Sequence, residues 1–440
     1  MIRLTDLRGL NITPTSAASF VPRVPAGDSD LPHVVEELML SVRHNGLSAL
    51  VDQAATFDGV DNLEPLTTSA ELSRAAAQLE RSLKEAIQES IRRVRAASED
   101  SLPVSATTEF HTGGTVTMRH VPVHRAGVYV PGGKAVYPSS VIMNVVAAQA
   151  AGVKEIVLVS PPQAEFEGRI HPTILATAEL LGVTEVYALG GAGAIAALAW
   201  GVPELDLNPV AVITGPGNQY VAAAKRAVRG VVGIDSEAGP SEIAIIADAT
   251  AHPEFVAADL VSQAEHDELA SVVLVTDSWE LAQRVTLSLE RRAAEAENTE
   301  RVSSALGGEQ SALLVCDSLE HAVWLSNAMA PEHLQVMVSE PEKLLPLLTN
   351  AGAIFVGNYT PVSAGDYAAG SNHVLPTHGT AAFSSGLSPL TFPRSQQIVD
   401  YDKQALSHIA AHVENFARAE HLPAHAEAIA VRFRLEDDGA

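Results

Sequence analysis

The chain contains 440 residues, 47% hydrophobic and only 5% aromatic, and its 28 basic and 53 acidic side chains give a formal net charge of −25. This length indicates two or three domains, and the acidic balance argues against a nucleic-acid partner because phosphate binding requires a basic surface. No apolar stretch reaches the roughly 18 residues of a membrane helix, and the N-terminus lacks a secretory hydrophobic segment. The single cysteine, Cys316, allows no intrachain disulfide, and the apolar run around it predicts a buried thiol. We therefore expect a cytoplasmic protein with no membrane partner.

The N-terminal part of the chain predicts an arm followed by a helical region. Residues 1–30 are rich in Ser, Pro, Thr and Gly, a composition typical of an arm rather than a core. Residues 69–97 combine apolar positions near the helical period with many charges, which predicts one long surface helix.

From about residue 126, short apolar segments alternate with helical patterns, which is typical of βαβ units and a mostly parallel sheet. In the first block we expect strands at 128–130, 155–160, 185–189 and 209–214, and helices at about 139–151, 171–181 and 191–199. In the second block we expect strands at 242–247, 271–276, 312–316 and 353–356, and helices at 252–267 and 278–297. A His-rich helical segment, 403–434, closes the chain.

The predicted fold class is α/β, with two incomplete Rossmann-like domains built on parallel sheets. The expected organisation is an N-terminal arm at 1–25, a substrate and metal domain formed by 26–127 with 240–380, a dinucleotide domain at 128–239 and a C-terminal helical tail at 381–440.

Three glycine-rich loops follow predicted strands of the first block and precede helices, where backbone N–H groups can cradle a phosphate. They are Tyr129-Val-Pro-Gly-Gly133, Gly191-Ala-Gly193-Ala-Ile-Ala196 and Gly215-Pro-Gly-Asn218. The second fits G-x-G-x-x-A, but the acidic residue expected about 20 positions later is missing, because the next strand ends in Thr214. The loops favour a phosphate or dinucleotide site, and the alternative is a set of ordinary turns.

Glu332 and His333 place a carboxylate beside an imidazole, the two groups most often tuned to take a proton near neutral pH. Adjacent residues point apart on a regular helix or strand, so both can reach one substrate only from a turn or an element end. Such a pair suits a reaction with two proton removals, and the alternative is an exposed dipeptide.

A metal site is the third candidate feature. Gln263 and His266 are spaced i, i+3 on a predicted helix and could converge on one ion, and Asp366 lies in a glycine-punctuated loop. Two histidine pairs have the spacing i, i+4, namely His408/His412 and His421/His425. Each pair is either a further candidate for metal binding or part of a solvent-exposed helix face. Neither C-x-x-C nor H-E-x-x-H occurs, and no G-x-S-x-G nucleophile elbow is present. From spacing alone, the ligands stay undecided.

Longer motifs occur in an order and spacing that resemble one known family, histidinol dehydrogenase, over roughly residues 1–435. The family is zinc-dependent, uses NAD and is an intertwined homodimer, and it oxidises L-histidinol twice, through an aldehyde, to L-histidine in the last steps of histidine biosynthesis. The motifs are Tyr129-Val-Pro-Gly-Gly133, Gly215-Pro-Gly-Asn218, Ala238-Gly-Pro-Ser-Glu242, Ser262-Gln-Ala-Glu-His266, Pro331-Glu-His333, Gly365-Asp-Tyr367, Ser371-Asn-His-Val-Leu-Pro376 and Glu420-His-Leu-Pro-Ala-His425.

The resemblance assigns roles to individual residues. It implies that Glu332 and His333 are the acid/base pair and that Tyr129 and Asn218 contact NAD. The implied zinc ligands are Gln263, His266, Asp366 and His425. The implied substrate contacts are these four ligands together with Ser241, His333, His373 and Glu420, of which His373 and Glu420 lie in the region that the partner subunit supplies.

Two positions depart from the family pattern. Gly193 stands where the family usually has a glutamine that contacts NAD, and Pro331 stands where relatives often have alanine. Related enzymes oxidise other small polar alcohols, so a zinc/NAD dehydrogenase with another diol or amino alcohol as substrate is the alternative function. A non-catalytic metal- or nucleotide-binding protein is a further alternative, which the intact Glu332–His333 pair argues against.

Overall fold

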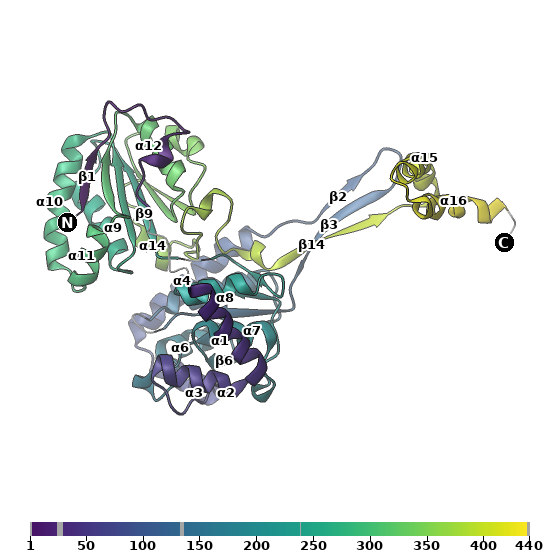
Figure 1. The fold of residues 1–440 in the computed structure, drawn as a ribbon, viewed down its shortest axis with the longest axis horizontal. Coiled ribbons are helices and arrows are strands. Elements are labelled where there is room, and N and C mark those ends of the chain that lie inside the picture. Colours follow the sequence, from purple (N-terminus) through teal and green to yellow (C-terminus); the bar gives the residue numbers. More distant parts are fainter. Residues whose placement is uncertain (1, 24–29, 133–135, 238, 438–440) are drawn as a thin grey trace. The chain divides into compact units, whose positions relative to one another are not determined.

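A computed structural model describes residues 2–23, 30–132, 136–237 and 239–437 (Figure 1). The chain divides into two compact units, which are treated separately below. The first unit contains Met1–Leu102 and Val123–Phe392, and the second contains Pro103–Pro122 and Pro393–Ala440. The predicted domain boundary at 25/26, Gly133 of the first glycine loop and Ala238 lie outside the described residues. The other predicted boundaries stay a prediction.

The first unit contains a five-stranded parallel sheet in the order β6-β5-β4-β7-β8. Its strands are β4 (Arg125–Tyr129), β5 (Glu155–Ser160), β6 (Glu185–Ala188), β7 (Val212–Thr214) and β8 (Gly233–Ile234). The chain reverses direction across the sheet between β4 and β7, the switch point at which doubly wound sheets bind ligands. The parallel sheet predicted for the first block is therefore confirmed.

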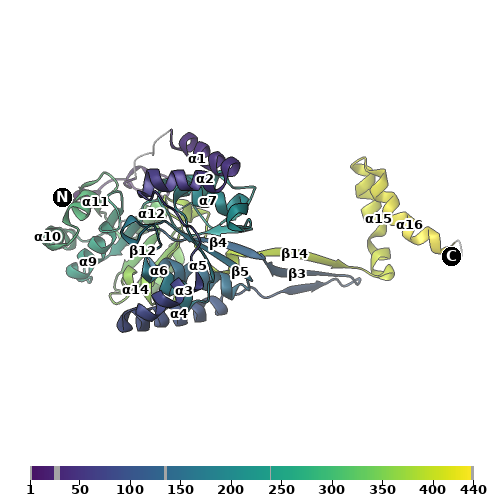
Figure 2. The same cartoon turned by 90° about the horizontal axis from the view of Figure 1, so that it is seen from below.

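Helices cover both faces of this sheet (Figure 2). One face carries α1 (Leu31–Asn45), α2 (Leu47–Gln53), α7 (Gly191–Trp200) and α8 (Gln219–Ala227), and the other carries α3 (Ser69–Gln78), α4 (Arg81–Asp100), α5 (Pro138–Ala150) and α6 (Pro172–Leu180). Apolar side chains of α1–α4, such as Met39 and Leu72, pack into the cores of the five-stranded sheet, whereas the prediction grouped 26–127 with 240–380.

The single helix predicted over 69–97 is two helices, α3 and α4. Leu79 and Glu80 between them have extended ψ angles of 131° and 139°, which ends the first helix. The Glu80 carboxylate accepts hydrogen bonds from the backbone N–H groups of Ser82 and Leu83, so it caps α4.

The first unit also contains a six-stranded parallel sheet in the order β1-β11-β10-β9-β12-β13. Its strands are β1 (Arg3–Asp6), β9 (Glu242–Ala247), β10 (Ser271–Thr276), β11 (Ala312–Val315), β12 (His333–Met337) and β13 (Ala353–Val356). Its helices are α9 (Pro253–Ala264), α10 (Trp279–Glu295), α11 (Thr299–Gly307), α12 (Leu319–Met329), α13 (Pro341–Leu344) and α14 (Val362–Tyr367). Strand β12 was not predicted, because the polar residues His333 and Gln335 interrupt its apolar pattern.

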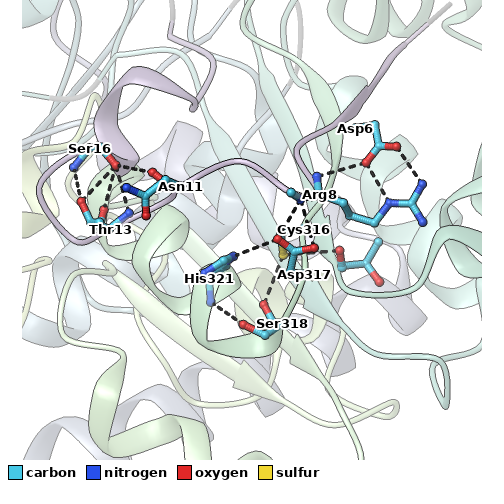
Figure 3. A network of polar contacts seen from close by, with 11 residues as sticks. Asp6, Arg8, Asn11, Thr13, Ser16, Cys316, Asp317, Ser318 and His321 are labelled. Atoms are coloured by element: carbon cyan, nitrogen blue, oxygen red, sulfur yellow. Dashed lines mark hydrogen bonds and ion pairs between the residues drawn. The ribbon is translucent and has the colours of Figure 1, made fainter.

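The N-terminal residues are part of this sheet, so their prediction as an arm outside the core is wrong. Strand β1 pairs with β11, and the side chains of Leu7, Ile12 and Ala17 are buried. Figure 3 shows Asp317 beside this N-terminal segment. The Asp317 carboxylate accepts hydrogen bonds from the backbone N–H of Gly9. The composition of residues 1–30 did not reveal β1, because an edge strand needs only a few apolar side chains.

Cys316, at the end of β11, is buried as predicted. Its Sγ donates to the carbonyl oxygens of Thr276 and Ser318, at 3.5 and 3.3 Å. Burial raises the pKa of this thiol to about 11, so it is protonated and unreactive at neutral pH.

The second unit contains an antiparallel sheet in the order β14-β3-β2 and two helices. Its elements are β2 (Ala106–Glu109), β3 (Thr115–Pro122), β14 (Pro393–Asp400), α15 (Lys403–Ala419) and α16 (Pro423–Asp437). The helical segment predicted over 403–434 consists of two helices, because Glu420–Leu422 separate them and His421 adopts a positive φ of 59°. Among the helices that the structure describes, none is long and apolar enough to cross a membrane.

Candidate active site

A cavity of about 280 Å³ lies at the carboxyl edge of the five-stranded sheet. Residues at the ends of four strands or just after them line it: Tyr129 ends β4, and Pro161, Gly190 and Asn218 follow β5, β6 and β7. The Tyr129 hydroxyl accepts a hydrogen bond from the backbone N–H of Gly191 at 3.4 Å. The structure thus brings the two predicted NAD contacts, Tyr129 and Asn218, to one cavity at the switch point.

The glycine loop after β7 is held against β4 by close backbone packing. Gly215 has a φ of 118°, and a Cβ built on it would lie 1.9 Å from the Tyr129 carbonyl oxygen, so no other residue fits there. Asn218 ends the loop and caps α8, since its Oδ1 accepts from the N–H groups of Tyr220 and Val221 at 3.0 and 3.1 Å.

A buried ion pair that the sequence did not reveal clamps this loop. Lys225 donates to the Gly215 carbonyl oxygen at 2.9 Å, and Asp235 accepts from the Gly215 N–H at 2.8 Å. The two side chains are 1% and 0% exposed and form an ion pair with each other. Lys225 and Asp235 therefore fix both peptide groups of Gly215. No local sequence signal marks them, because Lys225 has the spacing of an ordinary helical lysine.

A second group of polar residues lies at the amino edge of the six-stranded sheet. Ser241 immediately precedes β9, Glu332 immediately precedes β12, and His333 is the first residue of β12. The Glu332 Oε2 atom accepts a hydrogen bond from the Ser241 hydroxyl at 2.6 Å and from the Glu242 N–H at 2.9 Å. Burial raises the pKa of Glu332 to about 7, although both hydrogen bonds act in the opposite direction.

His333 presents a neutral ring with one free nitrogen. Its Nδ1 lies 3.0 Å from the Glu242 carbonyl oxygen, and because a carbonyl only accepts, Nδ1 carries the proton. Burial lowers the pKa of His333, which keeps the ring uncharged. Its buried Nε2 has no hydrogen-bond partner among the described residues and lies 3.9 Å from Asp366 Oδ1. An unprotonated Nε2 is therefore available as a base.

Glu332 and His333 lie just before and at the first residue of β12, so the pair is at an element end, where both side chains can reach one substrate. The exposed-dipeptide alternative is wrong, because the two residues are only 6% and 4% exposed.

Glu242 is a further buried carboxylate, which the sequence analysis placed in a strand and in a motif but to which it gave no functional role. Its Oε1 accepts from the His378 N–H at 3.2 Å, and its Oε2 has no partner among the described residues. Burial, together with the nearby Glu332 carboxylate, raises the pKa of Glu242 to about 7. The available signal was a charged residue at the head of an otherwise apolar strand.

The three predicted metal ligands of the first unit lie close to this edge, with local geometries that differ from expectation. Gln263 is in the last turn of α9, but His266 lies in the turn after the helix, where its N–H donates to the Gln263 carbonyl oxygen at 3.2 Å. Asp366 is on the short helix α14 rather than in a loop. Burial lowers the pKa of His266 and raises that of Asp366 to about 6.

These residues do not form a complete metal site by themselves. Gln263 is 2% exposed, and its Nε2 has no partner among the described residues. Within the described ranges, no three His, Cys, Asp or Glu side chains are grouped so that they could hold a metal ion. The fourth predicted ligand, His425, belongs to the second unit, as does Glu420.

His373 lies beside Asp366 of its own chain. Its Nδ1 is 2.9 Å from the Asp366 carbonyl oxygen, and its Nε2 is 3.3 Å from the Ser140 hydroxyl of α5. Burial lowers the pKa of His373 to about 4, so the ring is neutral. These contacts contradict the expectation that His373 lies in a region supplied by the partner.

Comparison with known proteins decides the family. The family model described as histidinol dehydrogenase matches residues 22–433. The chain belongs to the histidinol dehydrogenase family. The histidinol dehydrogenase of Leifsonia xyli subsp. xyli is 53% identical over 428 residues, which cover 97% of this chain and 98% of that protein. That of Thermobifida fusca is 50% identical over 440 residues, covering 100% and 99%.

A solved structure agrees with the sequence comparisons. The crystal structure of histidinol dehydrogenase from Elizabethkingia anophelis superposes with a TM-score of 0.93 at 34% identity and covers 99% of each chain. The predicted α/β fold class is therefore confirmed, and the chain is an oxidoreductase of the histidinol dehydrogenase family. The alternatives of a dehydrogenase for another alcohol and of a non-catalytic binder are not favoured.

Proposed function

We propose that the chain oxidises L-histidinol, through L-histidinal, to L-histidine in the final steps of histidine biosynthesis, with NAD as the acceptor and zinc as a bound metal. The observation that supports this most directly is the free, buried Nε2 of His333 next to a glutamate whose pKa is about 7. Two bases at one edge match a reaction that removes protons in two successive oxidations.

The residues present fit both cofactors. NAD would occupy the cavity that Tyr129 and Asn218 line, beside the N-terminus of α7, where backbone N–H groups favour phosphate. Zinc would be held by Gln263, His266, Asp366 and His425. A neutral imidazole and oxygen donors are ordinary zinc ligands, and burial lowers the pKa of His266, which favours its neutral ring. When bound, zinc would hold the substrate nitrogens and NAD would accept hydride.

The work of the protein side chains is proton transfer and positioning. In the first oxidation His333 Nε2 takes the proton of the substrate hydroxyl. In the second, Glu332 deprotonates a water that adds to the aldehyde, and His333 again takes a hydroxyl proton from the hydrate. Ser241 and the Glu242 N–H aim the Glu332 carboxylate, while His373 and Glu420 would contact the substrate.

The stoichiometry of NADH formation tests this function. Two NADH per histidinol, and one per histidinal, are expected, and the activity should disappear when a chelator removes the metal. One NADH or none per histidinol would contradict the proposal. Full turnover after verified metal removal would contradict the role of zinc.

The zinc assignment has its own test. Replacing His266 with Asn should release most of the bound zinc, measured by elemental analysis of the purified protein. His408→Asn is the matched control, because His408 is exposed on α15 and should leave the zinc content unchanged. A His266→Asn protein that keeps one zinc per chain would exclude His266 as a ligand.

We also propose a homodimer in which the second unit completes the partner's site with Glu420 and His425. In support, the second unit leaves large apolar side chains exposed, including Val399 at 63% and Phe416 at 72%. Co-expression of differently tagged His333→Asn and His425→Asn chains separates the two possible arrangements. If His425 acts in the partner, the purified heterodimer regains one intact site and about half the wild-type activity. An inactive heterodimer would show that His425 acts within its own chain.

A further inference from the structure

Gly193 is one of the two positions that depart from the family pattern, and side chains of another helix, α2, occupy the space beside it. It lies in the first turn of α7, and its φ is not in the positive region, so conformational freedom does not require a glycine there. A Cβ at this position would lie 2.5 Å from Gln53 Oε1 and 3.1 Å from a Leu50 methyl carbon. Glycine lowers helix stability relative to alanine. The space that Gln53 occupies is the physical reason for glycine here.

Gln53 is held in this position by its surroundings. It is the last residue of α2 and precedes the π-helical turn Ala54–Asp58. Its Nε2 donates to the Leu38 carbonyl oxygen of α1 at 3.0 Å, so the side chain is anchored at one amide atom. The anchored amide leaves Oε1 facing Gly193, and Gln53 itself lines the cavity with Gly190, Gly191 and Ala192 of the α7 N-terminus.

Few of the side chains that line the cavity carry an uncharged amide. Among the described residues that line it, two carry an uncharged primary amide, Gln53 and Asn218, and the Asn218 carbonyl oxygen already caps α8. A neutral amide can pair with both ribose hydroxyls and phosphate oxygens of a dinucleotide, whereas the Asp58 carboxylate in the same cavity would repel phosphate.

We propose that Gln53 is a cofactor-binding residue, and that Gly193 makes room for it to place an amide from α2 over the first turn of α7. This inference rests on the proposed NAD-dependent function. A preorganised amide contributes to affinity because its side chain is ordered before the ligand binds.

Equilibrium binding of NAD, measured by calorimetry without histidinol, tests the role of Gln53. Gln53→Ala should raise the Kd for NAD about tenfold, as expected for loss of one hydrogen bond. Gly193→Ala should also weaken binding, because the new methyl group displaces the Gln53 amide. Gln149→Ala is the matched control: this glutamine likewise donates to a backbone carbonyl, that of Leu181, but does not line the cavity.

The double variant Gln53→Ala/Gly193→Gln moves the amide to α7, where the space vacated by Gln53 can accept it, and should recover most of the lost affinity. The inference is overturned if Gln53→Ala binds NAD within twofold of the wild type, if Gln149→Ala loses as much, or if the double variant binds no more tightly than Gln53→Ala. A wild-type protein that does not bind NAD would instead overturn the proposed function.

Discussion

The two parallel sheets of the first unit have the same strand order but carry their candidate functional groups at opposite edges. In both, the first strand of the block lies in the middle, two later strands follow on one side and two on the other, and β1 is added at one edge of the larger sheet. The five-stranded sheet has a cavity at its carboxyl edge, lined mainly by glycines and apolar or uncharged side chains. The six-stranded sheet gathers titratable side chains at its amino edge.

In the six-stranded sheet, a carboxylate of the protein occupies the corresponding switch point at the carboxyl edge. Asp248 follows β9, and its Oδ2 accepts from the Ser339 N–H and hydroxyl after β12, at 2.7 and 2.8 Å. Its Oδ1 accepts from the Thr250 N–H at 2.9 Å. The protein's own carboxylate therefore satisfies the donors that an anionic ligand would need. Strand order alone does not locate a ligand site, because side chains at the strand ends decide which edge is open.

The largest effect is expected at the amino edge of the six-stranded sheet. His333→Asn removes the free Nε2 and should lower kcat for histidinol by about a thousandfold, within the range for loss of a general base. The Kd for NAD should be unchanged, because the cofactor cavity belongs to the other sheet. His111→Asn, at an exposed position, is the control. Loss of NAD binding in His333→Asn would contradict the assignment of proton transfer and NAD binding to different sheets.

At the carboxyl edge of the five-stranded sheet, Lys225→Met should destabilise the fold. It leaves the Asp235 carboxylate buried without its cation, which costs about 3–5 kcal/mol of unfolding free energy. Denaturant unfolding and the Kd for NAD should both change, since the Gly215 loop loses its clamp. Lys225→Met/Asp235→Asn should recover part of the stability. An unaffected Lys225→Met protein would show that the pair does not hold the loop.

Glu332→Gln distinguishes the roles of the two residues at the amino edge, because it should slow only one of the two oxidation steps. The oxidation of histidinal should fall about a hundredfold through loss of the base that activates water, while the oxidation of histidinol stays close to wild type. Glu342→Gln, at an exposed position, serves as the control. Equal losses in both steps would contradict the separate roles of Glu332 and His333.

A smaller effect concerns pH. Because the pKa of Glu332 is raised to about 7 and the base must be ionised, histidinal oxidation should rise with pH up to about 7 and level off above it. This rise in histidinal oxidation with pH should be absent in the Glu332→Gln variant. Because the pKa of Glu332 is higher in the folded protein than its ordinary value of 4.5, protonation of Glu332 stabilises the folded state. This stabilisation is fully present below pH 4.5 and is lost as the pH rises through about 7. A profile without a rise near pH 7 would argue against ionisation of Glu332 as the controlling step.

The sequence predicted the features that depend on local patterns. Apolar runs located most strands of both sheets, and the Glu332–His333 dipeptide indicated a site at an element end. Strand β12 escaped detection because His333 and Gln335 face the same side of an otherwise apolar segment. The Lys225–Asp235 clamp, the Glu242 contacts and the filling of Gly193 by Gln53 could not be predicted. Each depends on contacts between residues of different elements, which no local pattern specifies.

Strand β12 has a mechanistic consequence beyond its place in the sheet. The main chain of His333 pairs in register with Ile243 on one side and Ala353 on the other, and its ring is tied to Glu242. The Nε2 atom that we propose as the base therefore has a fixed position at the amino edge of the sheet. If one such nitrogen serves both oxidations, the reacting carbon must pivot between them, so that first the alcohol and then the hydrate turns a hydroxyl toward the same point.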